Sequence, residues 1–231
     1  MITIIPILGI GKINPGDDLA SIFASKLEEY IPIDKSDCIV VASKVVSKAR
    51  GRIPNYSTQK EKQQIIENES TRILRKRNDL TISETHHGFV CANAGIDESN
   101  TEPNTLVLLP KDIDSAANAI HQSLLAQFKI DVSVIISGAF GRPFRKGETN
   151  VALGMAGIIS SINLVGTRDF YGETLKTSTI AIADEIASAA ELVMHKADGI
   201  CVALVRGLPA SYRGDGKGSD LVRHPSEDLF R

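Results

Sequence analysis

This chain has almost no excess of charge of either sign, few cysteines and no long apolar run. Its 231 residues carry 26 Lys and Arg against 28 Asp and Glu, a formal net charge of −2. So small an imbalance argues against a general nucleic-acid or membrane-surface binder, and any basic patch must be local. The three cysteines, Cys38, Cys91 and Cys201, are odd in number and far apart. That pattern is typical of reduced thiols and not of disulfides or a zinc site.

No stretch is long and apolar enough to predict a membrane span. The longest uncharged stretch, residues 149–167, contains Asn, Ser and several Gly, so we expect a buried, tightly packed helix there. The chain opens without the charged and apolar regions of a targeting segment, because residues 1–8 run into Gly9 as a first strand would. These absences predict a cytoplasmic globular protein that binds neither nucleic acid nor membrane.

Strand-like and helix-like segments follow one another without a strict βαβ alternation. Apolar runs predict strands over residues 2–8, 38–42, 89–92, 106–109, 177–183 and 200–205, and another that begins at Val134. Asp17 and Asp18 can cap one helix and Asp114 another, and further helices are predicted over the charged residues 59–77 and over residues 184–194. This mixture favours the α+β class over a doubly wound sheet. No break in composition marks a linker, so we expect a single domain over residues 1–231.

Two short motifs could bind phosphate or metal, and each also has a purely structural interpretation. GIGK, residues 9–12, follows a predicted strand, where glycines let backbone N–H groups approach a phosphate and Lys12 adds charge. A plain tight turn explains it equally well. NAGIDESN, residues 93–100, presents Asp97, Ser99 and Asn100, which are hard oxygen ligands for magnesium or manganese. An Asx turn explains this motif in isolation.

Two further motifs concentrate cations beside predicted strands. In SKVVSKARGR, residues 43–52, Ser43 with Ser47 and Lys44 with Lys48 repeat at a spacing of four, so a helix places each pair on one side. A solvated basic face is an equal alternative. VIISGAFGRPFRKG, residues 134–147, ends in three cations that suit an anionic ligand: Arg142, Arg145 and Lys146.

Taken in order, these motifs resemble the gamma-glutamyl ligases that add glutamate to the precursor of the deazaflavin coenzyme F420. The resemblance covers nearly the whole chain and rests on GIGKINPGDD, VVASKVVSKARGRI, NAGIDESN, FGRPFRKG, GTRDFYGETL, ADEIASAAELV and ALVRGL. The tail LVRHPSEDLF is most similar to the ligase domain of the actinobacterial enzymes. Those enzymes continue into a flavin-reductase-like domain, which we do not expect in this chain.

The resemblance implies a reaction, its cofactors and a dimer. In that family GTP phosphorylates the carboxylate of the acceptor, and the amine of L-glutamate then displaces phosphate to form an amide. It implies Mg²⁺ or Mn²⁺, with K⁺ as an optional further ion, and an intertwined homodimer of mixed α+β fold.

The resemblance also implies site residues, position by position. The nucleotide contacts would be Gly9, Ile10, Gly11, Lys12, Ser43, Lys44, Lys48 and Asn100, together with Gly216, Gly218 and Ser219 from a glycine-rich tail segment. Asp97 would be a metal ligand, and Arg142 and Arg145 would be catalytic residues that handle phosphate.

One position departs from the family pattern. Family members usually end the strand that begins at Val134 with Thr-Asp-Thr, whose Asp and following Thr bind metal, whereas this chain has Ser137, Gly138 and Ala139. Gly138 and Ala139 carry no side-chain oxygen, and loss of a carboxylate weakens a divalent-metal site. Three hypotheses follow. The chain is a ligase of this family, a degenerate member that binds nucleotide or coenzyme without turnover, or an amino-acid ligase for a different phosphorylated acceptor.

Overall fold

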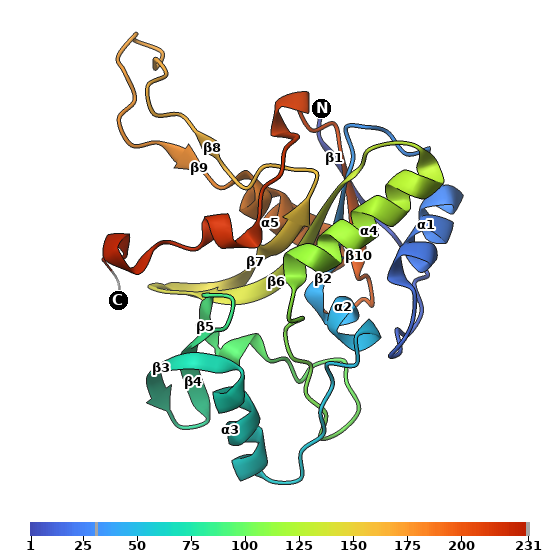
Figure 1. The fold of residues 1–231 in the computed structure, drawn as a ribbon, viewed down its shortest axis with the longest axis vertical. Coiled ribbons are helices and arrows are strands. Elements are labelled where there is room, and N and C mark those ends of the chain that lie inside the picture. The colour runs from blue at the N-terminus through green and yellow to red at the C-terminus, as the bar shows by residue number, and fades with distance from the viewer. Residues whose placement is uncertain (31, 230–231) are drawn as a thin grey trace.

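A five-stranded mixed sheet forms the centre of the molecule (Figure 1). The structure is a computed structural model that describes residues 1–30 and 32–229. The strand order is β1-β10-β2-β6-β7, with β2 and β6 parallel and the other neighbours antiparallel. These strands are β1 (Thr3–Pro6), β2 (Cys38–Ala42), β6 (Ser133–Arg142), β7 (Arg145–Ala156) and β10 (Val202–Arg206). The mixed sheet and its helices confirm the predicted α+β class.

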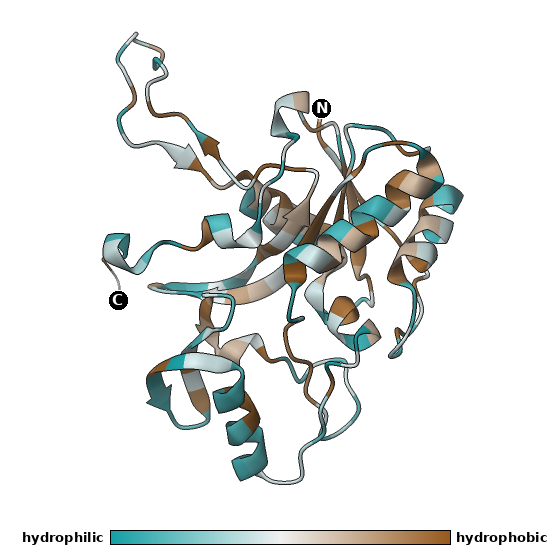
Figure 2. Ribbon diagram, viewed as in Figure 1, coloured by the Kyte–Doolittle hydropathy of each residue, from teal (hydrophilic) through white to brown (hydrophobic). Residues whose placement is uncertain are grey.

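Helices cover both faces of this sheet, which explains why its inner strand β2 is apolar along its whole length. Helices α1 (Leu19–Tyr30) and α4 (Ile113–Phe128) pack on one face, and α5 (Ile182–Met194) packs on the other. The alternation along β2 sends Val41 into the first core and Val40 into the second, and both are 0% exposed. Figure 2 shows the result as hydrophobic strands enclosed between the helices.

The remaining elements lie around the sheet. A second sheet has the order β3-β4-β5, and a third pairs β8 with β9 at the base of a projecting arm (Figure 1). The outer elements are α2 (Ser43–Ala49), α3 (Gln59–Asn68), β3 (Ser70–Arg77), β4 (Leu80–Thr85), β5 (Val90–Ala92), β8 (Ile162–Asn163) and β9 (Thr179–Ile180). Short 3₁₀ turns span Asn93–Gly95, Ala210–Tyr212, Gly218–Leu221 and Pro225–Glu227.

The single helix predicted over residues 59–77 is wrong in its second half. Helix α3 begins after Thr58, whose side chain accepts a hydrogen bond from the Glu61 N–H, and it ends at Asn68. The following residues form β3, which pairs with β4 across a turn in which Asn78 has a φ of 52°. Tertiary pairing with β4 therefore decides the structure of a charged segment whose own apolar pattern is weak.

Two other predictions of local structure are also wrong. The buried helix expected over residues 149–167 does not form: residues 149–156 belong to the strand β7, which pairs with β6 in a long hairpin, and Ile162–Asn163 form β8. The strand expected over residues 106–109 is a buried extended segment that makes isolated bridges, in which Val107 and Asp97 exchange backbone hydrogen bonds of 2.8 and 2.9 Å. Each is apolar, as expected, but period alone does not separate a buried strand from a helix or an extended segment.

The predicted helix caps are partly correct. Asp18 caps α1, since its Oδ1 accepts from the Ala20 N–H at 3.1 Å. Asp114 is no cap, because α4 begins at Ile113 and the Asp114 carboxylate instead accepts from the backbone of β7 and of the tail.

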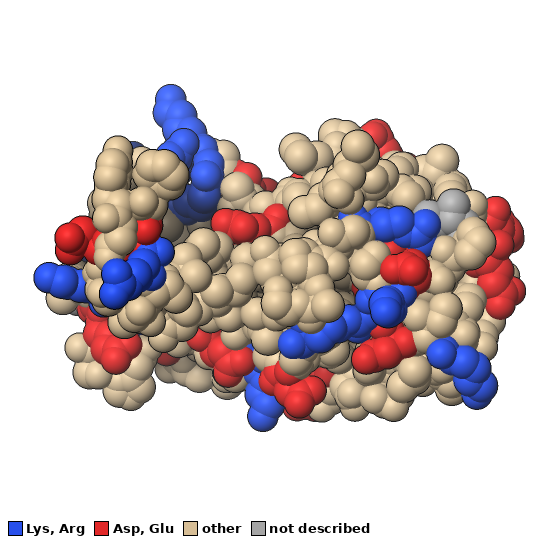
Figure 3. All heavy atoms as spheres, turned by 90° about the horizontal axis from the view of Figure 1, so that it is seen from above, with Lys and Arg blue, Asp and Glu red and all other residues tan. Residues whose placement is uncertain are grey.

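The described residues also bear on thiols, membrane and surface charge. The three cysteines are free, as predicted. Within the described ranges, no helix combines the length and apolar character needed to cross a membrane. On the face seen in Figure 3, cationic and anionic side chains lie interspersed around a broad uncharged area. The cytoplasmic location stays a prediction.

Candidate functional site

A cavity of about 500 Å³ opens where β2 ends. Strands β2 and β6 run parallel here with Ala42 opposite Ser137, and β6 is irregular between Ile136 and Ser137. Such carboxyl ends of neighbouring parallel strands are the usual place for ligand sites in sheets of this kind. Four segments that are distant in sequence contribute to the wall, from residues 10–13, 95–100, 107–109 and 194–201.

The cavity gathers most of the predicted nucleotide and metal residues. Those that line it are Ile10, Gly11, Lys12, Ser43, Lys44, Lys48, Asp97 and Asn100. Helix α2 follows β2 directly and carries two of the lysines one helical turn apart, so the spacing of four does place them on one side. The binding roles of all these residues stay predictions.

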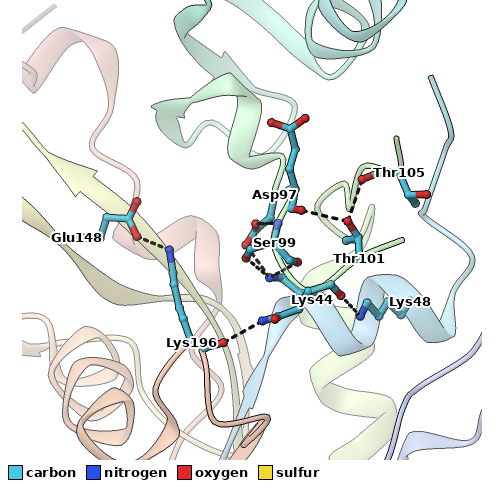
Figure 4. Close-up of polar contacts among 10 residues, drawn as sticks. Lys44, Lys48, Asp97, Ser99, Thr101, Thr105, Glu148 and Lys196 are labelled. Carbon is cyan, nitrogen blue, oxygen red and sulfur yellow. Dashed lines mark hydrogen bonds and ion pairs between the residues drawn. The ribbon is translucent and has the colours of Figure 1, made fainter. Parts of the chain in front are cut away.

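Lys44 and Asp97 form the central ion pair of the cavity. The Lys44 ammonium lies 2.8 Å from Asp97 Oδ2 and also donates to Ser99 Oγ at 2.8 Å and to the Ser99 carbonyl at 2.9 Å (Figure 4). Asp97 Oδ1 accepts from the Ser99 N–H at 2.6 Å, which is the Asx turn considered for this motif. Partial burial opposes ionisation of Asp97, but the hydrogen bonds from Lys44 and Ser99 outweigh it and hold the pKa of Asp97 below its usual value.

Lys48 and Lys12 add two more ammonium groups. Lys48 donates to the Asn100 carbonyl at 2.7 Å, and Lys12 pairs with Glu102 at 2.8 Å in an exposed position. Burial, together with the ammonium groups of Lys44 and Lys12, lowers the pKa of Lys48. This cluster of like charges favours an anion, because a phosphate would relieve the repulsion among the lysines.

The opposite wall comes from β7 and from the segment after α5. The Lys196 ammonium pairs with Glu148, and the Lys196 carbonyl accepts from Asn100 Nδ2 at 2.8 Å (Figure 4). The hydrogen bond that the Lys196 ammonium donates to Glu148 raises the pKa of Lys196, against the opposing effect of burial. Glu191 of α5 accepts from Asn150 Nδ2 at 2.8 Å, and both side chains line the cavity.

Sequence reasoning missed the segment 194–201. Its members on the cavity wall are Met194, His195, Lys196, Ala197, Gly199, Ile200 and Cys201. A local signal was present, because a short polar turn, HKADG, separates an apolar helix from an apolar strand. Its importance depends on β10 lying beside β2, which brings the turn to the end of β2.

Gly138 and Ala139 lie on the cavity wall, where they present no side-chain oxygen. A Cβ added at Gly138 would lie 2.7 Å from Leu153 Cδ1 and 3.3 Å from Ser43 Oγ. Leu153 is only 2% exposed. The space beside Gly138 is therefore already filled, and a larger residue at this position would displace its neighbours.

Arg142 and Arg145 are not brought to this cavity. They lie opposite each other at the end of the β6–β7 hairpin, beside Phe144, which is 91% exposed. Arg142 Nη2 donates to the Lys146 carbonyl at 3.0 Å, so the guanidinium braces the hairpin turn. Their catalytic role stays a prediction, and neither arginine lines the cavity of its own chain.

The predicted tail residues and Gly9 also lie off the cavity wall. Gly216 and Gly218 let the tail pack closely, since an added Cβ would lie 2.4 Å from the Ser160 nitrogen and 2.0 Å from the Leu153 carbonyl oxygen, respectively. Ser219 lies in the 3₁₀ turn Gly218–Leu221 that follows. These glycines serve packing of the tail, and the nucleotide contacts expected of Gly9, Gly216, Gly218 and Ser219 stay predictions.

The donor set accommodates one divalent cation better than two. Among the described residues, no group of three or more His, Cys, Asp or Glu side chains could hold a metal ion. Mg²⁺ bound with a nucleotide needs only one or two protein carboxylates. The Asp97 carboxylate keeps acceptor capacity beyond its two present partners, because it offers about four lone-pair sites. The residues thus fit one cation that arrives with phosphate and contacts Asp97, and they do not fit a second one held at Gly138 and Ala139.

Comparison with known proteins agrees with this arrangement. The sequence model of a family described as F420-0:gamma-glutamyl ligase matches residues 8–207. The coenzyme F420:L-glutamate ligase of Methanothermobacter thermautotrophicus is 39% identical over 249 aligned positions, which cover 100% of this chain and 99% of that protein. Proteins of the same description from Methanopyrus kandleri and Methanocaldococcus jannaschii are 38% and 40% identical, over 95% and 90% of this chain and 94% and 89% of theirs. Full-length similarity at this level confirms the predicted family, and the chain belongs to the F420-0:gamma-glutamyl ligase family.

Proposed function

We propose that this chain is a GTP-dependent ligase that forms an amide between L-glutamate and the carboxylate of the deazaflavin coenzyme F420 precursor. The observation that carries the proposal is a cavity lined by Lys12, Lys44, Lys48 and Asp97, in which Lys44 pairs with Asp97. The names of the relatives, coenzyme F420:L-glutamate ligases, support the choice of glutamate and of the acceptor.

The proposed reaction has two steps. A carboxylate oxygen of the acceptor attacks the γ-phosphorus of GTP, and the bond from that phosphorus to the bridging oxygen breaks to give an acyl phosphate and GDP. The glutamate amine then attacks the acyl carbon and loses a proton, and inorganic phosphate leaves to give the amide. Negative charge moves across phosphate oxygens in both steps, so fixed ammonium groups lower the barrier electrostatically.

The lysines have different capacities for this task. The Lys44 ammonium makes three close contacts, to Asp97 and to two atoms of Ser99, so it orders the loop that carries Asp97. Lys48 uses one of its three N–H donors on the Asn100 carbonyl, which leaves it able to bind phosphate. Mg²⁺ or Mn²⁺ bound with the nucleotide and held by Asp97 would supply further positive charge to the phosphate oxygens, and K⁺ is proposed as an optional further ion.

The test is product formation by the purified chain. GTP, Mn²⁺, L-glutamate and the deazaflavin precursor are incubated with it, and mass spectrometry follows the amide and GDP, which we expect in equal amounts. Lys48→Met should lower the rate at least tenfold, whereas Lys76→Met, which removes an ion pair between β3 and Glu67 of α3, should leave it unchanged. Amide formation only with other phosphorylated acceptors would keep the chemistry and change the substrate. No amide with any acceptor or amino acid refutes the proposal.

A second candidate is a degenerate family member that binds nucleotide or coenzyme without turnover. The absence of side-chain oxygens at Gly138 and Ala139 favours it. It predicts that GTP binds and that no GDP forms when acceptor and glutamate are present. Turnover of GTP by the purified chain with its acceptor excludes this candidate.

We also propose that the chain forms a homodimer. Large aromatic side chains are exposed at two projecting tips: Phe144 on the β6–β7 hairpin is 91% exposed, and Phe170 and Tyr171 on the arm are 95% and 89% exposed. Such side chains are enriched in protein interfaces. Light scattering should give twice the chain mass. If Arg145 acts on the partner's cavity, co-expressed Lys48→Met and Arg145→Met chains should regain activity that neither variant has alone.

A further inference from the structure

Lys196 brings a positive charge to the cavity wall opposite Lys44. Within the described part of the chain, the same cavity offers no set of ligands for a second metal ion. Lys196 lines the cavity together with Gly138 and Ala139, which have no side-chain oxygen. Leu153 occupies the space beside Gly138, so the wall is filled with hydrocarbon there. The neighbouring polar side chain on β7, Asn150, is an amide, which donates to Glu191 at 2.8 Å.

The main chain fixes where Lys196 stands. Helix α5 ends at Met194, and His195 then takes a φ of 44°, which turns the chain across the cavity. The Lys196 carbonyl accepts from Asn100 Nδ2 at 2.8 Å. Asn100 also offers its own carbonyl to the Lys48 ammonium at 2.7 Å. Asn100 therefore connects both walls. Figure 4 shows Lys196 on one side of the close-up and Lys48 on the other.

The side chain of Lys196 is held by a partner that can release it. Its ammonium pairs with Glu148 of β7, and both side chains are 54% exposed. A pair so exposed contributes little to the stability of a fold. Water can solvate the Glu148 carboxylate once the lysine leaves, and an ammonium on a flexible stem readily exchanges a carboxylate for a phosphate.

We propose that the Lys196 ammonium serves as the second cation of this site, in place of a second metal ion. When the nucleotide binds, the ammonium breaks its pair with Glu148 and pairs with the phosphate groups, so that the site works with one divalent metal ion. Glu148 holds the ammonium in place while the cavity is empty. This inference rests on the proposed function, because it takes a nucleoside triphosphate as the ligand. Lys196 would thus supply positive charge in place of the metal ion that Gly138 and Ala139 cannot help to bind.

The experiment measures affinity and metal content instead of activity alone. Calorimetry gives the affinities of GTP and GMP for the wild type and for Lys196→Met, Lys196→Arg, Glu148→Gln and the control Lys76→Met. Electron paramagnetic resonance counts Mn²⁺ ions bound per chain with a non-hydrolysable GTP analogue. We expect one Mn²⁺ per chain. We expect GTP affinity to fall at least tenfold in Lys196→Met with little change for GMP, and to be largely retained in Lys196→Arg.

Glu148→Gln separates this role from a structural one. If the ammonium must leave Glu148, this variant binds GTP as tightly as the wild type or more tightly. Equal weakening by Lys196→Met and Glu148→Gln would show that the pair only supports the fold, and would overturn the inference. Two Mn²⁺ ions per chain, or wild-type affinity in Lys196→Met, would overturn it as well. If the wild type binds no GTP, the proposed function fails first, and this inference fails with it.

Discussion

Gly138→Ala tests how tightly the cavity wall is packed. The added Cβ would lie 2.7 Å from Leu153 Cδ1, which is 0.7 Å inside the 3.4 Å at which ordinary contact begins (3.4 − 2.7). Leu153 is buried and cannot turn into solvent. Overpacking of this kind costs about 1–3 kcal/mol, and the smaller entropy of the unfolded alanine chain returns about 0.4–1 kcal/mol.

The expected net loss for Gly138→Ala is about 1–2 kcal/mol, which lowers the Tm by roughly 2–8 °C in a chain of this size. Thermal unfolding followed by circular dichroism measures it. Gly141→Ala is the matched control in the same strand, because no atom lies within 4 Å of its added Cβ. It should be neutral or slightly stabilising. Equal stability of the two variants would refute the reasoning.

The same contact decides how a lost metal ligand could be restored. Gly138→Asp with Ala139→Thr would place oxygens on the wall, but the aspartate would meet Leu153 first. Shortening Leu153 to Val relieves that contact, so the penalties of the two changes should be less than additive. If the site works with one metal ion, the triple variant should gain little activity, whereas a large gain, and a smaller one without Leu153→Val, would show that the metal site had been lost.

Three further predictions concern stability and reactivity. The Asp37 side chain is 0% exposed and accepts two hydrogen bonds from the Arg206 guanidinium. Arg206→Met removes that partner and should lower the free energy of unfolding in urea by about 3 kcal/mol. Asp97 has a folded pKa below its ordinary 3.8, so it contributes stability above that pH and loses it as the pH falls through the folded pKa. The difference in urea midpoint between wild type and Lys44→Met should therefore shrink between about pH 6 and about pH 3. Burial raises the pKa of Cys201 to about 11, so alkylation should be slow at about pH 8, fast in urea, and slower still with GTP in the cavity.

Each of these has an outcome that contradicts it. A loss in Arg206→Met no larger than the roughly 0.5 kcal/mol expected for a surface change would show that Asp37 finds another partner. A difference between wild type and Lys44→Met that does not change with pH would remove the Asp97 carboxylate as its source. Alkylation of Cys201 unaffected by bound nucleotide would place the nucleotide elsewhere.

The sheet could be predicted from the sequence where burial is complete. Residues 38–42 are apolar on both faces and form β2 as expected, because helices cover the sheet on both sides. The family resemblance implied that Lys44 and Lys48 contact the nucleotide and that Asp97 binds its metal, and all three line the cavity.

The rest depends on contacts between distant segments. Nothing local distinguishes β3 from a continuation of α3, because β3 is fixed by its register with β4. Lys196 enters the cavity only because β10 pairs with β2. Gly216 and Gly218 allow close passage of the tail over β7 and the residues after it, a contact between distant segments that the glycines alone do not predict.

The Asp114 carboxylate bears on the order in which the parts of the molecule fold, because it binds both β7 and the tail. Asp114 Oδ1 accepts from the Met155 N–H at 2.9 Å and from the Gly218 N–H at 3.0 Å. The first bond joins α4 to β7, and the second joins the tail to both. The binding place for the tail therefore forms only after α4 has packed against the β6–β7 hairpin. The tail should be the last part to pack on folding and the first to detach on unfolding. In hydrogen exchange, the amide of Gly218 should report this opening earlier than the amide of Met155.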